Sequence, residues 1–313
     1  MNEDTVLVTS RSFGQGKKDP EAILRAAGVR VVRGDPLHDV TALREPLQVA
    51  TGWIAGAAPI TEEHFSVAPR LRLVARYGVG CDAVDLEAAR RHGALVTNTP
   101  GANAQAVAEM TIGLMLAALR HTINADRAAH AGDWSARVGR ELGALAVGIV
   151  GYGRIGQAVH KLLQGFGSQV LVHDPYLSDA GVPLVDLPTL AHHADVITLH
   201  APPTSQPLVD ARLLDLMREG AVLINTARAA LVDESAVAQA LRSGRLSALA
   251  TDVLTDDAGS PLLDAPNVTI TPHIAGQTVQ SVDRMGMAAA EECVRVLTQG
   301  LAPRHPVSAV EIG

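Results

Sequence analysis

The chain has 313 residues, 47% of them hydrophobic and 19% charged, which is enough apolar material for about two packed domains and excludes a disordered protein. Its 26 basic and 33 acidic residues give a net charge of −7, so we expect no nucleic-acid partner. The two cysteines, Cys81 and Cys293, are too few for a disulfide framework, and we expect a cytoplasmic protein. Its polar start and interrupted apolar stretches predict neither a secretion signal nor a membrane span.

Short β-branched runs alternate with helical patterns in the first part of the chain. Helices are expected at Pro20–Ala27, where Gly28 ends the pattern, and at Asp85–His92. The runs expected to form strands are Val6–Val8, Val29–Val32, Trp53–Ile54, Leu71–Ala75 and Ala94–Thr97. Strands that alternate with helices predict parallel βαβ units, with helices on both faces of the sheet.

A second series of elements begins after residue 98. Pro100 and Gly101 precede a long helical stretch over Ala102–Ala129, and a last helix is expected over Gln280–Thr298. Further strands are expected at Ala146–Val150, Gln169–Val172, Val196–Leu199, Ala221–Ile224, Ala248–Ala250 and Val268–Ile270. We therefore expect an α/β protein with two sheets, in which residues 1–98 and 284–313 form one domain and residues 99–283 form a domain inserted into it.

A glycine-rich loop follows the strand expected at Ala146–Val150. Gly151, Gly153 and Gly156, with Arg154 and Ile155 between them, form a G-x-G-x-x-G motif that opens a helix. In such a loop the glycines permit a tight turn, close approach of the backbone to a pyrophosphate and close packing of helix on strand. The context of strand, loop and helix predicts a Rossmann domain that binds a dinucleotide.

The next expected strand ends in Asp174, 18 residues after Gly156. An acid about 20 residues after the motif binds the ribose hydroxyls and repels a 2′-phosphate, so Asp174 and Pro175 predict NAD as the cofactor. A turn or helix-capping role for Asp174 is the alternative.

Three polar side chains follow later strands of the inserted domain. Arg228 lies just past one strand, Asp257 lies in the loop beyond the next, and His273 follows the last. Reduction of a ketone by a nicotinamide requires a cation that orients the substrate, an acid that protonates its oxygen and a carboxylate that holds that acid. These three residue types predict that chemistry, although each of them alone is more often structural.

Taken together, these motifs resemble the D-isomer-specific 2-hydroxyacid dehydrogenase family, which includes phosphoglycerate dehydrogenases. The matching stretches cover nearly the whole chain: Ala75–Asp82, Asn98–Asn103, Gly151–Gly156, Ile224–Asp233 and Asn267–Gly276. The resemblance implies a Rossmann NAD-binding domain over 99–283, inserted into a split, flavodoxin-like substrate domain over 1–98 and 284–313. It also implies a homodimer built around the helix at Ala102–Ala129, and the nearly continuous apolar run Val107–Leu119 predicts a covered helix as well.

The resemblance also assigns roles to individual residues. Arg228 orients the substrate, His273 is the acid and base, and the loop of Tyr77, Gly78, Val79 and Gly80 binds the substrate carboxylate through backbone N–H groups. Asp252 corresponds to the residue that binds the nicotinamide carboxamide. Further cofactor contacts are expected at Val107, His200, Pro202, Thr204, Thr226, Ala227 and Gly276. No metal ligand is expected.

The chain departs from the family at three places. Asp257 stands where the family usually has Glu followed by Pro, and the shorter side chain requires a shifted loop to reach His273. Ala229 replaces the usual Gly after the arginine, which argues against a left-handed backbone there. Ala55–Ala58 lacks the Arg-Ser pair that members acting on 3-phosphoglycerate often carry.

Two other functions share this fold. Formate- or phosphite-oxidising relatives have the same cofactor site, but the formate type carries Gln in place of the carboxylate at Asp257. An NAD(H)-sensing corepressor keeps the arginine and the histidine, so Arg228 and His273 do not exclude that function.

Arg11 lies between two serines after the first strand. A cation there suits a distal phosphate, phosphonate or carboxylate on the substrate, as in phosphonopyruvate or phosphohydroxypyruvate. A solvated loop arginine is the equally good alternative.

Overall fold

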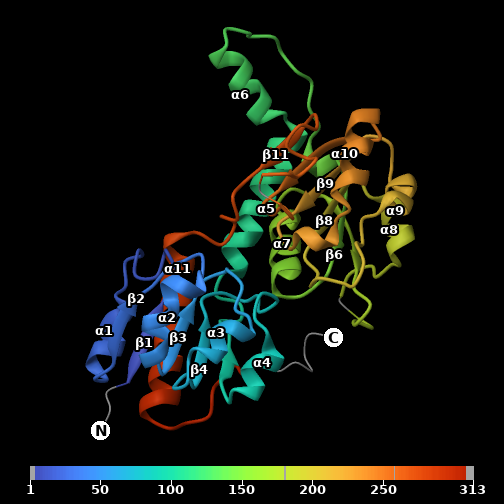
Figure 1. Ribbon diagram of the computed structural model, residues 1–313. Helices are drawn as coiled ribbons and strands as arrows, with labels where there is room; N and C mark the ends of the chain where they lie inside the picture. The colour runs from blue at the N-terminus through green and yellow to red at the C-terminus, as the bar shows by residue number, and fades with distance from the viewer. Residues whose placement is uncertain (1–3, 180, 257, 308–313) are drawn as a thin grey trace. The chain divides into compact units, whose positions relative to one another are not determined.

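The computed structural model describes residues 4–179, 181–256 and 258–307, and the chain divides into two compact units (Figure 1). Unit 1 consists of Met1–Asn103 and Gly276–Gly313, and unit 2 of Ala104–Ala275. The boundaries expected from the sequence differ from these by several residues, at 98/99 and 283/284. Each unit is an α/β domain on one parallel sheet, so the predicted fold class is confirmed.

The sheet of unit 1 has the strand order β2-β1-β3-β4-β5. The strands are β1 (Thr5–Val8), β2 (Arg30–Arg33), β3 (Gly52–Ala55), β4 (Leu73–Arg76) and β5 (Leu95–Thr97). This is the flavodoxin-like order, which reverses between β1 and β3. The loops that follow these two strands, Ser10–Phe13 and Gly56–Pro59, therefore lie where such sheets bind ligands.

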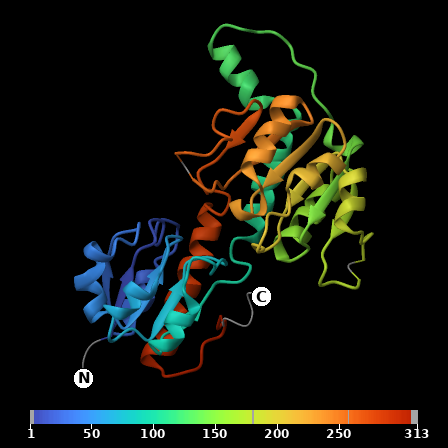
Figure 2. The ribbon, with the colours of Figure 1, turned by 45° about the vertical axis from the view of Figure 1, so that its right-hand side comes forward.

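Helices cover both faces of this sheet because alternate strand residues point to opposite sides. Trp53 and Ala55 of β3 pack into one apolar cluster, whereas Ile54 packs into the other. One face carries α1 (Pro20–Ala26) and α11 (Val279–Cys293), which the π-turn η3 (Val294–Thr298) extends (Figure 2). The other face carries α2 (Val40–Val49), α3 (Glu62–Ser66) and α4 (Leu86–Arg91).

A buried hydrogen-bond network fixes the carboxyl end of β1. The Nδ1 of His38 lies 3.1 Å from the Pro59 carbonyl, which only accepts, so this nitrogen carries the hydrogen and Nε2 accepts from the Thr9 hydroxyl at 2.7 Å. The Trp53 indole N–H donates to the same hydroxyl oxygen at 2.9 Å. Burial lowers the pKa of His38 to about 4, so its ring stays neutral and holds the Gly56–Pro59 loop.

The sheet of unit 2 has the strand order β11-β10-β9-β8-β6-β7. The strands are β6 (Ala146–Val150), β7 (Gln169–His173), β8 (Val196–Leu199), β9 (Ala221–Asn225), β10 (Leu246–Thr251) and β11 (Val268–Ile270). The order reverses at β6, which pairs with β7 on one side and β8 on the other. The glycine-rich loop directly after β6 therefore lies at the topological switch point, where dinucleotides bind.

Two helical layers cover this second sheet. One face carries α5 (Ala104–Leu119) and α7 (Arg154–Gln164), and the other carries α8 (Leu187–His193), α9 (Ala211–Leu216) and α10 (Glu234–Ser243). Short 3₁₀ turns, η1 (Leu142–Ala144) and η2 (Ala229–Leu231), precede β6 and follow β9. The doubly wound arrangement predicted from the alternating pattern is thus present in both units.

The prediction of one helix over Ala102–Ala129 is wrong. The stretch breaks into α5 and α6 (Thr122–His130), which meet at an angle of 61°. His121, at the break, has a φ of 53°, a left-handed conformation that cannot continue a helix. Among the described residues no single helix is long and apolar enough to cross a membrane. Only the bent pair of α5 and α6, taken together, has the length and the apolar composition that a membrane span requires.

The apolar run Val107–Leu119 is explained within one chain. Helix α5 packs against α7, β9 and β10, and its apolar side chains lie in the same core cluster as the sheet. Its composition therefore needs no second copy, and the run is no argument for a dimer. In contrast, α6 buries none of its residues and stands away from the rest of unit 2 (Figure 1), and Trp134 and Val138 in the segment after it are 86% and 95% exposed.

Candidate active site

The glycine-rich loop of unit 2 has the geometry that the motif predicts. Gly151 has a φ of 89°, and a Cβ there would lie 2.6 Å from the backbone of His200 and Ala201. A Cβ on Gly156 would lie 2.2 Å from the Gly151 carbonyl oxygen, so helix α7 packs directly on the loop. A Cβ on Gly153 would have no neighbour within 4 Å. The loop is therefore tight where it meets the sheet and open where a phosphate would approach.

These residues fit a dinucleotide cofactor. Arg154 and Ile155 open α7, and the first N–H groups of a helix have no partner within it. The positive end of the helix dipole lies at the same place, and both features stabilise a bound phosphate.

Asp174 lies beside this loop, at the end of β7. Its carboxylate accepts hydrogen bonds from the backbone N–H of Tyr152 at 2.8 Å and of Tyr176 at 3.0 Å. The second contact is the turn role considered above, but two bonds leave other lone pairs of the carboxylate available. Pro175 and Tyr176, which follow, are exposed and bring no cation. Asp174 can thus hold the loop and still accept from ribose hydroxyls.

The segment after β8 flanks the same loop. The Nε2 of His200 and the Thr198 hydroxyl share a hydrogen bond of 3.0 Å. Burial lowers the pKa of His200 to about 3, so its ring is neutral. Its Nδ1 is buried and has no partner among the described residues. Pro202 and Thr204 are exposed beyond it, where the Thr204 hydroxyl donates to the Gln206 carbonyl at 2.6 Å. These two residues border the switch-point loop without being part of the core.

Two residues assigned to the cofactor have structural partners. The hydroxyl of Thr226 lies 2.9 Å from that of Thr111, which also donates to the Val107 carbonyl. Val107 and Thr226 are 4% and 8% exposed. Their predicted contacts with the cofactor, and that of the half-buried Ala227, stay predictions.

Arg228 is positioned by a buried asparagine at the end of β9. The Asn225 amide donates to the Arg228 carbonyl at 2.9 Å and accepts from the Ala227 N–H at 3.0 Å. The Arg228 guanidinium donates to the Ala227 carbonyl at 2.8 Å and is half-buried. Ala229 begins a 3₁₀ turn and has no left-handed φ, so alanine is compatible with this position.

His273 lies in an exposed loop after β11 and has a φ of 53°. Its N–H donates to the Asp252 carbonyl at 3.0 Å. Asp252 itself is 1% exposed, and its carboxylate accepts from the N–H groups of Ile274 at 2.9 Å and Ala275 at 2.8 Å. The expected acid and the expected carboxamide-binding residue are therefore joined directly.

Asp257, the predicted partner of His273, lies outside the described residues. The loop on both sides of it is fixed by Glu234 of α10. Its carboxylate accepts from the Thr255 N–H at 2.7 Å and from the Ser260 hydroxyl at 2.6 Å.

In unit 1, the loop after β4 offers backbone donors. Gly78 has a φ of 143°, which favours glycine. The carbonyls of Gly78 and Val79 accept from Thr99 and Asn98, but within the described part of the chain the N–H groups of Gly78, Val79 and Gly80 donate to no protein group. Consecutive unpaired N–H groups suit a carboxylate. Gly276, at the start of the second segment of this unit, is half-buried against Asn103.

Tyr77 differs from these donors because both its side chain and its N–H have structural partners, and its predicted contact with the substrate stays a prediction. Its ring is 8% exposed in the core, and its hydroxyl donates to the Val282 carbonyl of α11 at 3.1 Å. Its N–H donates to the Ala55 carbonyl at 3.0 Å. Tyr77 therefore anchors the loop to the core of unit 1.

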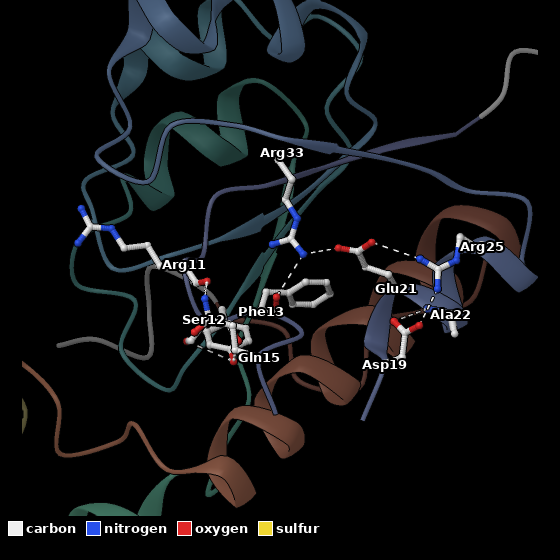
Figure 3. A network of polar contacts seen from close by, with 10 residues as sticks. Arg11, Ser12, Phe13, Gln15, Asp19, Glu21, Ala22, Arg25 and Arg33 are labelled. Carbon is white, nitrogen blue, oxygen red and sulfur yellow. Dashed lines mark hydrogen bonds and ion pairs between the residues drawn. The ribbon is translucent and has the colours of Figure 1, made fainter. Parts of the chain in front are cut away.

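Arg11 is exposed at the end of β1 (Figure 3). Figure 3 shows its guanidinium directed away from the neighbouring network, in which Glu21 pairs with Arg25 and Arg33. Among the described residues the Arg11 guanidinium has no hydrogen bond or ion pair, although its charge contributes to the lowered pKa of Asp35. The cation is thus available to a ligand, and the alternative of a solvated arginine is equally compatible.

Two residues that position these loops are not indicated by any motif in the sequence. Asn225 is one, and Arg76 is the other: it is 5% exposed and donates to the Gly80 carbonyl at 3.1 Å and the Ala55 carbonyl at 3.4 Å. Both are the last residues of their strands, which is the only signal that would have found them.

The sequence pattern described as "D-isomer specific 2-hydroxyacid dehydrogenase, NAD binding domain" matches residues 112–275, slightly more than half of the chain. The chain belongs to this family. Unit 2, which contains nearly all of this match, accordingly corresponds to the NAD-binding domain of the family, in agreement with the fit of its glycine-rich loop.

Individual relatives support the assignment. The D-3-phosphoglycerate dehydrogenase of Mycobacterium leprae is 38% identical over 79% of this chain and 49% of its own length. The hydroxypyruvate reductase of Thermotoga maritima is 34% identical over 78% of this chain and 83% of its own length. The crystal structure of the TT0316 protein from Thermus thermophilus has a TM-score of 0.88 and 38% identity, and the match covers 97% of this chain and 99% of that one. The chain spans about half the length of the phosphoglycerate dehydrogenases it matches.

Proposed function

We propose that this protein is an NAD-dependent oxidoreductase that interconverts a small 2-oxo acid and the corresponding D-2-hydroxy acid. The observation that carries the proposal is the arrangement in unit 2. A loop that fits a dinucleotide follows β6, and Arg228 and His273 follow β9 and β11 of the same parallel sheet. Ligands of such sheets bind at the carboxyl ends of the strands, where all three features lie.

In this proposal the residues of the chain bind the substrate and move one proton. When bound, NADH supplies the hydride that reduces the carbonyl carbon. His273 donates a proton from its ring to the carbonyl oxygen as negative charge develops there, and takes it back in the oxidation direction. Arg228 binds the oxygen atoms of the substrate through its planar guanidinium. The N–H groups of Gly78, Val79 and Gly80 bind the substrate carboxylate.

An NADH-oxidation assay over a panel of 2-oxo acids tests the function. Glyoxylate, pyruvate and hydroxypyruvate represent substrates without a distal anion, and phosphohydroxypyruvate and phosphonopyruvate represent those with one. We expect NADH oxidation with at least one of them. A protein that binds NADH but oxidises it with none would instead be a cofactor-sensing protein.

We further propose that the preferred substrate carries a distal anion, which Arg11 binds. Arg11→Ala should raise KM for phosphohydroxypyruvate or phosphonopyruvate by about 10–100-fold, the effect of losing a charged hydrogen bond, and leave KM for glyoxylate unchanged. Arg30→Ala is the control, because Arg30 is an exposed arginine at the opposite end of the same sheet. An equal effect on both substrate classes, or faster turnover of the acids without a distal anion, would contradict this assignment.

The cofactor is proposed to be NAD(H) in preference to NADP(H). Asp174 accepts from ribose hydroxyls but repels a 2′-phosphate, so kcat/KM should be higher with NADH than with NADPH. Asp174→Ala should narrow that ratio, mainly through KM. Asp186→Ala is a matched control. Asp186 is the N-cap of α8, and its replacement by alanine removes a similar hydrogen bond from a backbone N–H to a carboxylate. Equal use of the two cofactors by the wild type would refute the preference.

We also propose a homodimer, now on different grounds from the apolar helix α5. Helix α6 buries none of its residues, and the exposed side chains of Ile123, Trp134 and Val138 offer apolar surface that a second copy would cover. Light scattering at micromolar protein should give the mass of a dimer, and a monomer mass would exclude this assembly.

A further inference from the structure

The loop Thr271–Ala275 is bound at several points to one buried residue. The Asp252 carboxylate accepts from the N–H groups of Ile274 and Ala275 and from the Thr271 hydroxyl. The Asp252 carbonyl accepts from the N–H of His273 itself. One residue thus bonds four of the five members of the loop that presents His273.

The backbone of His273 explains why such a clamp is needed. Its φ of 53° is the left-handed conformation, which a residue with a Cβ rarely adopts and keeps only when surrounding contacts fix it. The His273 side chain is exposed and so receives little packing of its own. Its backbone N–H donates to the carbonyls of Asp252 and Thr271, both at 3.0 Å, and Asp252 also bonds the residues on either side of His273 in this loop.

The burial of Asp252 supports the same interpretation. Its side chain follows directly on β10, the residue is 1% exposed, and no Lys or Arg pairs with it in the described part of the chain. A buried carboxylate of this kind is stabilised by its hydrogen-bond donors, and here these all belong to the His273 loop. Its own N–H donates to the Asn225 carbonyl of β9 at 2.9 Å, which ties it to the strand that Arg228 follows.

We propose that Asp252 is the positioning residue that holds His273 in its working conformation. This inference rests on the proposed function, in which His273 is the acid. It differs from the role that the family resemblance gives Asp252, because a contact with the nicotinamide carboxamide would not require bonds to the histidine loop.

Asp252→Asn tests the proposal and separates the positioning of His273 from a contact with the nicotinamide carboxamide. The amide keeps the size of the side chain, but its NH₂ group cannot accept from a backbone N–H. We expect kcat to fall by about 10²-fold, the scale of a small misplacement of a catalytic group, with the Kd of NADH unchanged. The fall should be equal with NADH and with the reduced 3-acetylpyridine analogue, which has no amide N–H for Asp252 to accept. Asp233→Asn, an N-cap in the same unit, is the matched control and should keep kcat.

An NMR titration of the histidine rings gives a readout that does not depend on turnover. His273→Asn identifies the His273 signal by its loss. In Asp252→Asn this signal should move towards the shift of an unrestrained histidine while the other histidine signals stay in place. An unchanged His273 signal, or a loss of kcat confined to NADH with normal turnover of the analogue, would overturn the proposal. If the wild type turned over no 2-oxo acid, the proposed function would fail, yet the NMR result would still decide whether Asp252 positions His273.

Discussion

Replacing His273 by alanine should lower kcat for 2-oxo acid reduction by about 10²–10⁴-fold, the usual effect of removing a positioned acid. The side chain is exposed, so its removal leaves no cavity, and the loss should appear in kcat with little change in the Kd of NADH. Steady-state kinetics and cofactor fluorescence measure the two quantities on the same preparation.

The left-handed backbone of His273 requires a second variant. Alanine is strained at a φ of 53°, and a shifted loop could by itself reduce activity. Asparagine tolerates this conformation but cannot donate an acidic proton. His273→Asn should therefore lose as much activity as His273→Ala, whereas His192→Ala, at an exposed histidine of α8, should lose none. Near-full activity of His273→Asn would show that another group protonates the substrate.

Local patterns made the cofactor loop predictable from the sequence. The three glycines from Gly151 to Gly156, the apolar strand before them and Asp174 after them are close together in the chain, and each spacing has one geometric reason. The strands were predictable for the same reason, because most of them contain a short run of apolar residues, many of them β-branched. Arg228 and His273 could be singled out as site candidates because each lies shortly after such a run.

Contacts between distant residues set the limits of the sequence analysis. Tyr77 lies in a loop that offers backbone donors, but its hydroxyl bonds a carbonyl 205 positions away, and no local pattern indicates that partner. The hydrogen bond from the Ile274 N–H to the Asp252 carboxylate, 22 positions earlier in the chain, is likewise not indicated by any local sequence pattern. Such contacts depend on which strands become neighbours in the sheet.

Helix boundaries were less predictable than strands. The sequence pattern does not predict α2, which contains Pro46 in its interior, or α3, which has only five residues. The apolar run of α5 continued smoothly into the pattern of α6, and only the left-handed His121 between them ends the first helix. The same apolar run was interpreted as a dimer surface, although the sheet of its own unit covers it.

Replacing Arg228 by alanine is expected to lower kcat/KM for the 2-oxo acid by about 10²–10⁴-fold. A planar guanidinium can make two charge-assisted hydrogen bonds to the substrate, each contributing about 1.5–3 kcal/mol. The loss should fall on both KM and kcat, because the same group binds the substrate and stabilises charge on its oxygen. The Kd of NADH should not change.

Arg228→Lys separates charge from geometry at this position. Lysine keeps the positive charge but not the fork of donors, so kcat/KM should recover only part of the loss. Arg212→Ala, at an exposed arginine of α9, is the control for removing a cation from the same unit. If Arg228→Lys were as active as the wild type, a positive charge alone would be enough to bind the substrate. The proposed paired hydrogen bonds from the planar guanidinium would then be wrong. If Arg228→Ala instead weakened NADH binding and left KM for the 2-oxo acid unchanged, Arg228 would belong to the cofactor site that follows β6 and not to the substrate.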